Sequence, residues 1–115
     1  MCTGALILGA AGLLKGLQAT THWAVLPQLA NFGAIPTSAR VVEQGKIITA
    51  AGVSSGIDMA LRLASKLGGD TMAHAIQVGI EYDPQPPFDG SYQRAPAPVM
   101  AILRNLYTRR GLMTE

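Results

Sequence analysis

The chain has 115 residues, of which 49% are hydrophobic, 14% charged and 5% aromatic, with a formal net charge of +2. This composition excludes an intrinsically disordered tail, which would be rich in charge and poor in apolar side chains. The single cysteine, Cys2, excludes a disulfide-stapled secreted module, and the scarcity of aromatic residues argues against a nucleic-acid partner bound by base stacking.

The apolar N-terminal segment, residues 1–17, resembles a signal peptide only superficially. Its apolar stretch has a suitable length, but no Lys or Arg precedes it. The stretch is also too short to cross a bilayer, which takes about 20 apolar residues. We therefore predict a buried helix over residues 3–11, ended by Gly12, in a cytoplasmic protein without a membrane partner.

Short strands and turns are predicted in the middle of the chain. Residues 18–23 are rich in β-branched and aromatic types, which favour a strand. Residues 26–31 predict one or two helical turns, with Pro27 near the first position. Residues 39–43 and 46–50 predict two further strands, joined by a glycine-containing turn as in a hairpin.

Two helices with apolar faces are predicted after this hairpin. The first, over residues 54–67, opens with Ser55 and Asp58 in the S-x-x-D spacing of a capping box. The second is expected to be capped by Asp70 or Thr71. The side chains expected to face inward are Ile57, Ala60, Leu61, Ala64 and Leu67 in the first helix, and Met72, Ala73, Ile76 and Ile80 in the second.

The last part of the chain changes character. Residues 83–98 hold most of the seven prolines and predict an extended, ordered segment, followed by an amphipathic helix over Val99–Arg110 whose Arg109 and Arg110 form a solvated end. Strands that alternate with helices predict an α/β fold with a largely parallel sheet. A strand that opens through Gly52 onto the following helix forms the kind of turn where such sheets bind ligands.

Cys2 and His22 are the candidates for chemistry. At the start of a helix the Cys2 thiol would face free amides that favour the thiolate, and Gly4 would let the backbone turn sharply, as in a nucleophile elbow; an inert buried cysteine is the alternative. His22 could orient or protonate a bound group, or be a hydrogen-bonded structural histidine. His74 is expected to be structural, and no metal site or cofactor is predicted, because the sequence has no Cys/His cluster and no phosphate loop.

Four segments carry a recognisable pattern: CTGALILGAAGLL at 2–14, ATTHW at 19–23, RVVEQGKIITAAGVSSGIDMAL at 40–61 and IEYDPQPPF at 80–88. In this order they resemble the ThiJ/PfpI superfamily of class I glutamine amidotransferase-like domains, and within it the isonitrile (cyclohexyl-isocyanide) hydratase group. The resemblance implies a flavodoxin-like three-layer sandwich with a mostly parallel sheet. Residues 1–115 would be a partial domain of this kind, its C-terminal portion, with the N-terminal part missing.

The resemblance also implies roles for individual residues. Cys2 matches the nucleophile of the elbow, and Thr3 matches the next residue, whose hydroxyl borders the pocket in the hydratase group. Protease-like members have histidine at the position of Thr3, so a Cys-His peptidase loses its main support. The residues expected in the pocket or beside it are Gly4, His22, Gly52, Val53 and Ser54. The acidic partner of the cysteine would lie in the missing part, because the capping box already accounts for Asp58.

Four functions remain open at this point. The leading expectation is an isonitrile hydratase-like lyase, a homodimer by resemblance, in which Cys2 converts a small isocyanide into an N-substituted formamide. The second is a ligand-sensing domain like those of AraC-type transcription regulators. The third is a redox or stress-response protein in which Cys2 is oxidised. The fourth is an inactive remnant that folds poorly.

Overall fold

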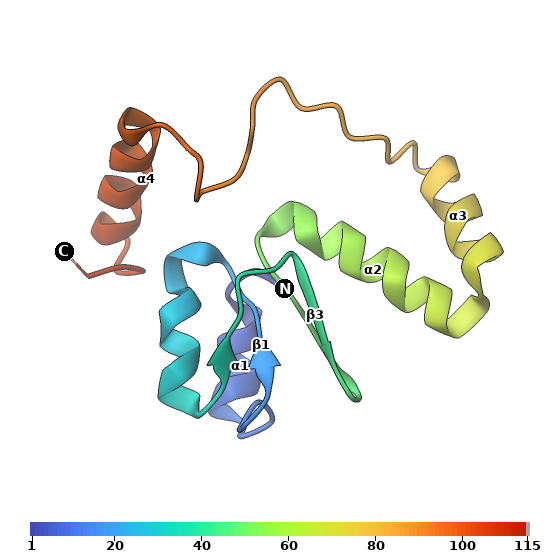
Figure 1. Ribbon diagram of the computed structural model, residues 1–115, viewed down its shortest axis with the longest axis horizontal. Helices are drawn as coiled ribbons and strands as arrows, with labels where there is room; N and C mark the ends of the chain where they lie inside the picture. Colours follow the sequence, from blue (N-terminus) through green and yellow to red (C-terminus); the bar gives the residue numbers. More distant parts are fainter. Residues whose placement is uncertain (115) are drawn as a thin grey trace. The chain divides into compact units, whose positions relative to one another are not determined.

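Helices alternate with short strands along most of the chain (Figure 1). The computed structural model describes residues 1–114 and divides them into a first unit, Met1–Asp83, and a second unit that begins at Pro84. The first unit contains η1 (Cys2–Gly4), α1 (Ala5–Ala10), β1 (Gln18–Ala19), η2 (Trp23–Phe32), β2 (Ile35–Pro36), β3 (Val41–Gln44), β4 (Ile47–Ala50), α2 (Val53–Gly68) and α3 (Asp70–Gly79). The second unit contains α4 (Ala97–Arg109).

The strands form two pairs. β1 and β2 run parallel, whereas β3 and β4 form the predicted antiparallel hairpin, with Gly45 in the turn at a φ of 60° that suits glycine. The two pairs are joined where the amide of Thr20 donates to the hydroxyl of Thr49 over 3.0 Å. The predicted α/β class is confirmed, and the structure places the ends of β1 and β4 close to each other.

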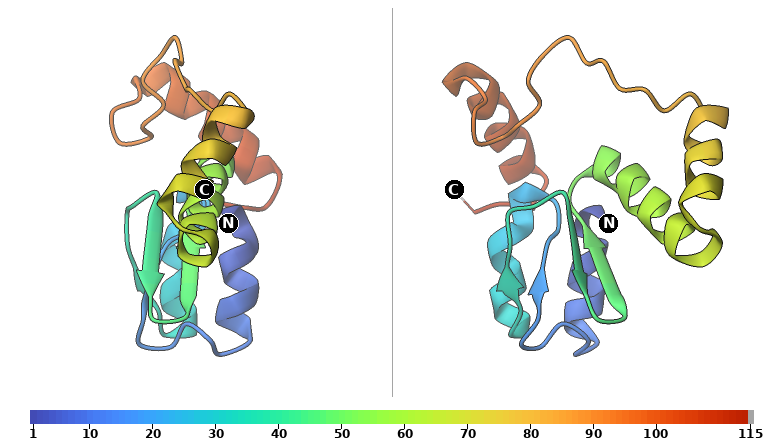
Figure 2. Two further views of the ribbon diagram at one scale, coloured as in Figure 1. Left: turned by 90° about the vertical axis from the view of Figure 1, so that its right-hand side faces the viewer. Right: turned by 45° about the vertical axis from the view of Figure 1, so that its right-hand side comes forward.

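The core of the first unit lies between α1, η2 and the β1–β2 pair (Figure 2). It is built from small and medium apolar side chains, namely Ala5, Leu14, Ala19, Leu29 and Ala34. The backbone of α1 comes close to η2 at Gly9, where an added Cβ would stand 2.7 Å from Cδ2 of Phe32. Glycine therefore permits the contact that fixes α1 against η2.

The predicted strand 18–23 is shorter in the structure, and the helical turns after it are longer. β1 ends at Ala19, because His22 already serves as the N-cap of η2, with its Nδ1 accepting a hydrogen bond from the amide of Ala24. Pro27 lies inside η2 and not at its first position. Composition favoured a strand here, but the side-chain cap ends it early.

The predicted capping box of α2 is wrong. The helix begins one turn earlier than the box requires, with Gly52 as its N-cap, so that Ser55 lies inside the helix and is buried. The carboxylate of Asp58 binds Arg40 and Tyr82 instead. The predicted caps Asp70 and Thr71 are also wrong, because Gly69 is the N-cap of α3 and Asp70 accepts a hydrogen bond from Ser65. In both helices the N-cap is a glycine, and no side chain among the described residues caps it.

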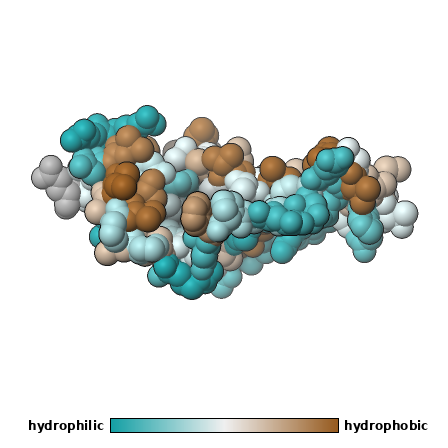
Figure 3. Space-filling model, turned by 90° about the horizontal axis from the view of Figure 1, so that it is seen from above, coloured by the Kyte–Doolittle hydropathy of each residue, from teal (hydrophilic) through white to brown (hydrophobic). Residues whose placement is uncertain are grey.

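The apolar faces predicted for α2 and α3 are largely exposed. Ala73 is the one predicted inward residue that is buried, while Leu67 is 82% exposed and Ile76 is 41% exposed. The two helices pack against each other, but most of their apolar faces meet no other element of this unit. Figure 3 shows that apolar side chains gather in patches on the surface. Helical periodicity identified the faces correctly; burial depends on tertiary partners that periodicity does not reveal.

In the second unit, residues 84–96 contain no helix or strand, as the prolines predict, and α4 then starts with Pro98 in its first turn. Within this segment Arg94 and Asp89 form an ion pair of 2.7 Å. The helices of residues 1–114 are all too short or too polar to cross a membrane.

Candidate functional site

Cys2 has an unusual backbone conformation. Its φ of 51° lies in the left-handed region, which costs a residue other than glycine free energy and persists only when the surroundings impose it. Here the amide of Cys2 donates to the carbonyl oxygen of Ala51 over 2.8 Å. The carbonyl oxygen of Cys2 accepts the amide of His22 at 3.1 Å and the hydroxyl of Thr21. These bonds hold the half-buried thiol residue in its strained conformation.

The partners of Cys2 come from the carboxyl ends of two strands. Thr21 and His22 follow β1, and Ala51 follows β4, so the turn into η1 and α1 lies where both strands end. In Figure 1 the N-terminus accordingly lies beside β4 and the start of α2. Ligands of α/β sheets bind at such carboxyl ends. A strained residue at this edge of the strands is what the predicted nucleophile elbow requires, and here the strained residue is the cysteine.

Gly4 does not make the sharp turn that the sequence suggested. Its φ of −61° is an ordinary helical value, so the left-handed residue of the elbow is Cys2 and not Gly4. A Cβ built at Gly4 would meet no described atom within 4 Å, which leaves open space beside η1. Thr3 is exposed between the two residues.

His22 approaches the elbow with its backbone and its ring. The backbone amide of His22 donates a hydrogen bond to the carbonyl oxygen of Cys2. The Cδ2 atom of its imidazole lies 3.5 Å from a Cβ built at Gly52. Because Nδ1 accepts from Ala24, the neutral ring carries its proton on Nε2. Burial lowers the pKa of His22 below its ordinary value, so the imidazole is neutral at neutral pH.

The turn from β4 into α2 completes the candidate site. Gly52 lies beside the His22 ring, whereas Val53 and Ser54 are exposed in the first turn of α2. The structure thus brings Cys2, His22 and Gly52 together through described contacts. His74 lies elsewhere, exposed on α3.

Sequence reasoning missed a polar cluster behind this turn, formed by Arg40, Asp58 and Tyr82. Asp58 accepts the Nε–H of Arg40 at 2.8 Å and the hydroxyl of Tyr82 at 2.6 Å. Burial opposes ionisation of Asp58, but the hydrogen bonds from Tyr82 and Arg40 together with the charge of Arg40 prevail and lower the pKa of its carboxyl. The three residues are far apart in the sequence, and spacing alone could not connect them.

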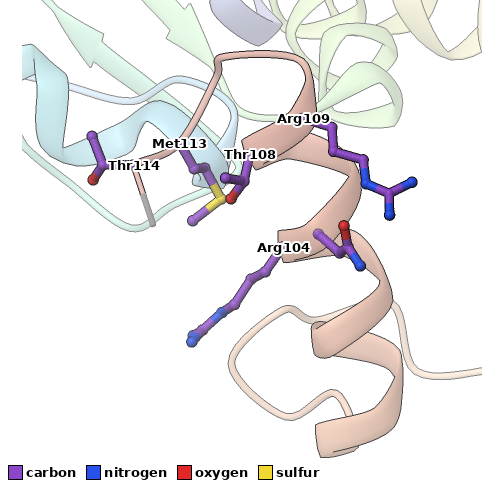
Figure 4. A pocket seen from close by; sticks show the side chains of 6 residues that line it. Arg104, Thr108, Arg109, Met113 and Thr114 are labelled. Carbon is purple, nitrogen blue, oxygen red and sulfur yellow. The ribbon is translucent and has the colours of Figure 1, made fainter.

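The second unit has an open cavity of about 670 Å³ on α4 and the residues after it (Figure 4). It contains none of the predicted site residues. Thr108 and Met113 lie near each other there, but Arg104 and Arg109 point in different directions, so their charges do not converge on one ligand. Among residues 1–114, no group of three His, Cys, Asp or Glu side chains is placed to hold a metal ion.

The described site is therefore a left-handed cysteine at the carboxyl ends of the strands of an α/β unit. Residues 1–66 match the model of the DJ-1/PfpI family. The chain belongs to the DJ-1/PfpI family, as the resemblance implied.

Two relatives and one solved structure show how close the similarity is. The chain is 52% identical over 101 residues to an isonitrile hydratase of Pseudomonas putida, covering 87% of this chain and 44% of that protein. It is 32% identical over 85 residues to Protein DJ-1 homolog A of Arabidopsis thaliana, covering 74% of this chain and 22% of that protein. A crystal structure of a ThiJ/PfpI family protein from Pseudomonas syringae superposes with a TM-score of 0.89 at 50% identity, covering 94% of this chain and 45% of that chain. The chain therefore spans less than half the length of each of these proteins.

Proposed function

We propose that the chain carries the nucleophile of an isonitrile hydratase-like lyase, with Cys2 as the reacting residue. The observation that carries this proposal is the left-handed Cys2, held at the ends of β1 and β4 by hydrogen bonds to Ala51 and His22. The 52% identity to an isonitrile hydratase supports an isocyanide as the small-molecule substrate. Because the chain spans 44% of that relative, the activity of a whole enzyme is part of the proposal.

The reaction balances without an oxidant or a cofactor. The sulfur of Cys2 attacks the terminal carbon of R–N≡C, a C–S bond forms, and that carbon takes up the proton lost by the thiol, which gives a thioimidate R–N=CH–S–Cys2. Water then adds to the same carbon, the C–S bond breaks, and the thiol regains a proton. The product is the formamide R–NH–CHO, so that the net change is the addition of one water molecule.

The neighbouring residues would orient the substrate and donate hydrogen bonds to it. Thr3 and Gly4 border open space beside the thiol, where the isocyanide would approach. His22 is neutral with its proton on Nε2, which suits this nitrogen to donate a hydrogen bond and not to act as a base. The backbone amides of the turn at Gly52–Ser54 would donate hydrogen bonds to the nitrogen of the thioimidate.

The acidic partner implied by the resemblance is not supplied by Asp58. Its two carboxylate oxygens are bound by Arg40 and Tyr82, so they are not available to hold the proton of the thiol. We propose further that the active protein is a cytoplasmic homodimer, as the resemblance to the hydratase group implies.

Incubation of the purified protein with an alkyl isocyanide tests the proposal, with the formamide measured by mass spectrometry. Cys2→Ser, which keeps the shape of the side chain but removes the thiol, should lower turnover by at least about 10³-fold. His74→Gln is the matched control, because His74 is exposed on α3 away from Cys2, and it should turn over like the parent protein. Formamide production by Cys2→Ser at the parent rate would refute the role of Cys2.

A further inference from the structure

Arg40 holds the turn beside the elbow from two sides. Its backbone carbonyl accepts the amide of Ala51 over 2.9 Å at the end of β4. Its guanidinium donates to Asp58 over 2.8 Å and, at 3.4 Å, to the hydroxyl of Ser54 in the first turn of α2. One residue thus fixes both the last residue before the turn and the helix that follows it.

The same turn is the support of Cys2. Ala51 receives the amide of Cys2 on its carbonyl oxygen and donates its own amide to Arg40, so that Arg40, Ala51 and Cys2 form a continuous chain of hydrogen bonds. A left-handed cysteine returns to an ordinary conformation when its partners move. Any displacement of Ala51 therefore acts directly on the conformation of Cys2.

Asp58, which binds the guanidinium of Arg40, is itself held in place by Tyr82. Tyr82 donates its hydroxyl to Asp58, and the lowered pKa of the Asp58 carboxyl keeps it charged at neutral pH, where it holds the guanidinium. The side chains of Arg40 and Asp58 are 57% and 32% exposed, and an ion pair this accessible contributes little to the free energy of unfolding. The two hydrogen bonds of the Arg40 guanidinium, to Asp58 and Ser54, therefore fix the geometry of the turn more than they raise the free energy of unfolding.

We propose that Arg40 is a positioning residue for Cys2, which it holds in the left-handed conformation through the Ala51–Ser54 turn. This inference rests on the proposed function only in taking Cys2 as the reacting residue. Arg40 does not touch the thiol, and it acts through the carbonyl of Ala51 and the start of α2.

A second ion-pair group provides the matched control. Glu43 lies on β3, the strand that follows Arg40. Its carboxylate forms ion pairs with two residues of α2, Lys66 at 2.9 Å and Arg62 at 3.7 Å. These ion pairs connect β3 to α2, and their side chains are about as exposed as those of Arg40 and Asp58. They do not involve the Ala51–Ser54 turn. If ion pairs between these elements served stability alone, removal of either group would have the same consequence.

Amide hydrogen exchange measured by NMR on the 115-residue protein separates the two cases. In Arg40→Ala, the amides of Cys2 and His22 should exchange about tenfold faster than in the parent, whereas Glu43→Gln should leave both rates unchanged. Arg40→Lys keeps the positive charge but lacks the guanidinium that binds Asp58 and Ser54 together, so it should give intermediate exchange rates. Where the protein turns over isocyanide, Arg40→Ala should lower kcat by about tenfold at an unchanged KM.

Unchanged exchange of Cys2 in a folded Arg40→Ala variant, or equal acceleration by Glu43→Gln, would overturn the proposal. If Arg40→Ala does not fold, Asp58→Asn replaces it, because it removes the charged anchor of the guanidinium at nearly constant shape. Parent-like exchange of Cys2 in Asp58→Asn would then overturn the proposal. A parent protein that makes no formamide contradicts the hydratase function alone, since the exchange rates still decide the role of Arg40.

Discussion

His22 combines a structural and a chemical task in one residue. Its amide fixes the carbonyl of Cys2, and its Nδ1 caps η2 by accepting the amide of Ala24 at 3.2 Å. Because Nδ1 is the acceptor in this cap, the proton of the neutral ring lies on Nε2. A loss of activity in a His22 variant could arise from either task, so a test must separate them.

We expect His22→Asn and His22→Ala to differ in stability but not in activity. Asparagine is a good N-cap and should keep the free energy of unfolding near that of the parent, whereas alanine should lower it by about 1 kcal/mol. Both variants lack the Nε2 proton and should lose isocyanide turnover alike. Chemical denaturation and formamide assays check the two effects, and full activity in His22→Asn would remove the imidazole from the mechanism.

The stability of the parent should also depend on the protonation of His22. Because the pKa of His22 is lowered in the folded protein, the unfolded chain binds the proton first. The resulting contribution to stability is complete above the ordinary pKa of 6.5 and is lost as the pH falls through the folded value. His22→Asn should remove this part of the pH dependence, which thermal unfolding between neutral and mildly acidic pH measures; an unchanged profile in the variant would contradict the assignment.

Gly9 and Gly4 should respond oppositely to alanine, although they lie in one helical segment. At Gly9 the new Cβ would stand 2.9 Å from Cγ and 3.0 Å from Cβ of Phe32, so the contact between α1 and η2 must open, at a cost of about 1–3 kcal/mol. At Gly4, with open space and a helical φ, alanine should stabilise the protein by up to about 1 kcal/mol. Urea unfolding of the two variants compares them, and equal midpoints would contradict this packing.

At the scale of elements, Tyr82 fastens the segment after α3 to α2. Its hydroxyl reaches the Asp58 carboxylate, and this hydrogen bond, followed by burial and the negative charge of Asp58, raises the pKa of the Tyr82 phenol. A phenol with a raised pKa contributes to stability below its ordinary pKa of 10.0, and this contribution is lost as the pH rises through the folded value. The α2–α3 pair is therefore expected to loosen at strongly alkaline pH.

Ultraviolet titration of tyrosinate should show this coupling directly. The chain has three tyrosines, and one of them should ionise at higher pH than it does in the unfolded chain. Tyr82→Phe should remove that late component, and Asp58→Asn should shift it to lower pH, because the acceptor loses its charge. Persistence of the late component in Tyr82→Phe would contradict the assignment to Tyr82.

The elements differ in how far the sequence could predict them. The β3–β4 hairpin was predictable, because β-branched residues flank a glycine turn. The start of α2 was not, because its N-cap is Gly52 and a capping-box pattern at Ser55 and Asp58 happens to lie inside the helix. The candidate site shows the same division. Cys2 and His22 were identified from residue type and resemblance, while Arg40 acts through contacts that exist only in the folded chain.

At the scale of the whole molecule, both units leave apolar side chains exposed. Hydrogen bonds within the first unit hold Cys2, His22, Arg40 and Tyr82. Much apolar surface is exposed in both, for example Leu67 in α2 and Ile102 in α4. The high apolar content of the sequence is thus not matched by an equally large core, and covering that surface would stabilise the protein.

Limited proteolysis with chymotrypsin should cut first after Phe88. This side chain is 81% exposed in a segment without helix or strand, whereas Phe32 and Tyr82 are partly buried, the former in η2 and the latter bound to Asp58. Mass spectrometry would identify the products, and Phe88→Ser should slow the first cut. Because the contacts of the elbow lie before the cut, the fragment 1–88 should keep the slow amide exchange of Cys2. A first cut inside η2 would contradict the expected order of cleavage, and loss of this protection in the fragment would contradict the assignment of the Cys2 contacts to residues 1–88.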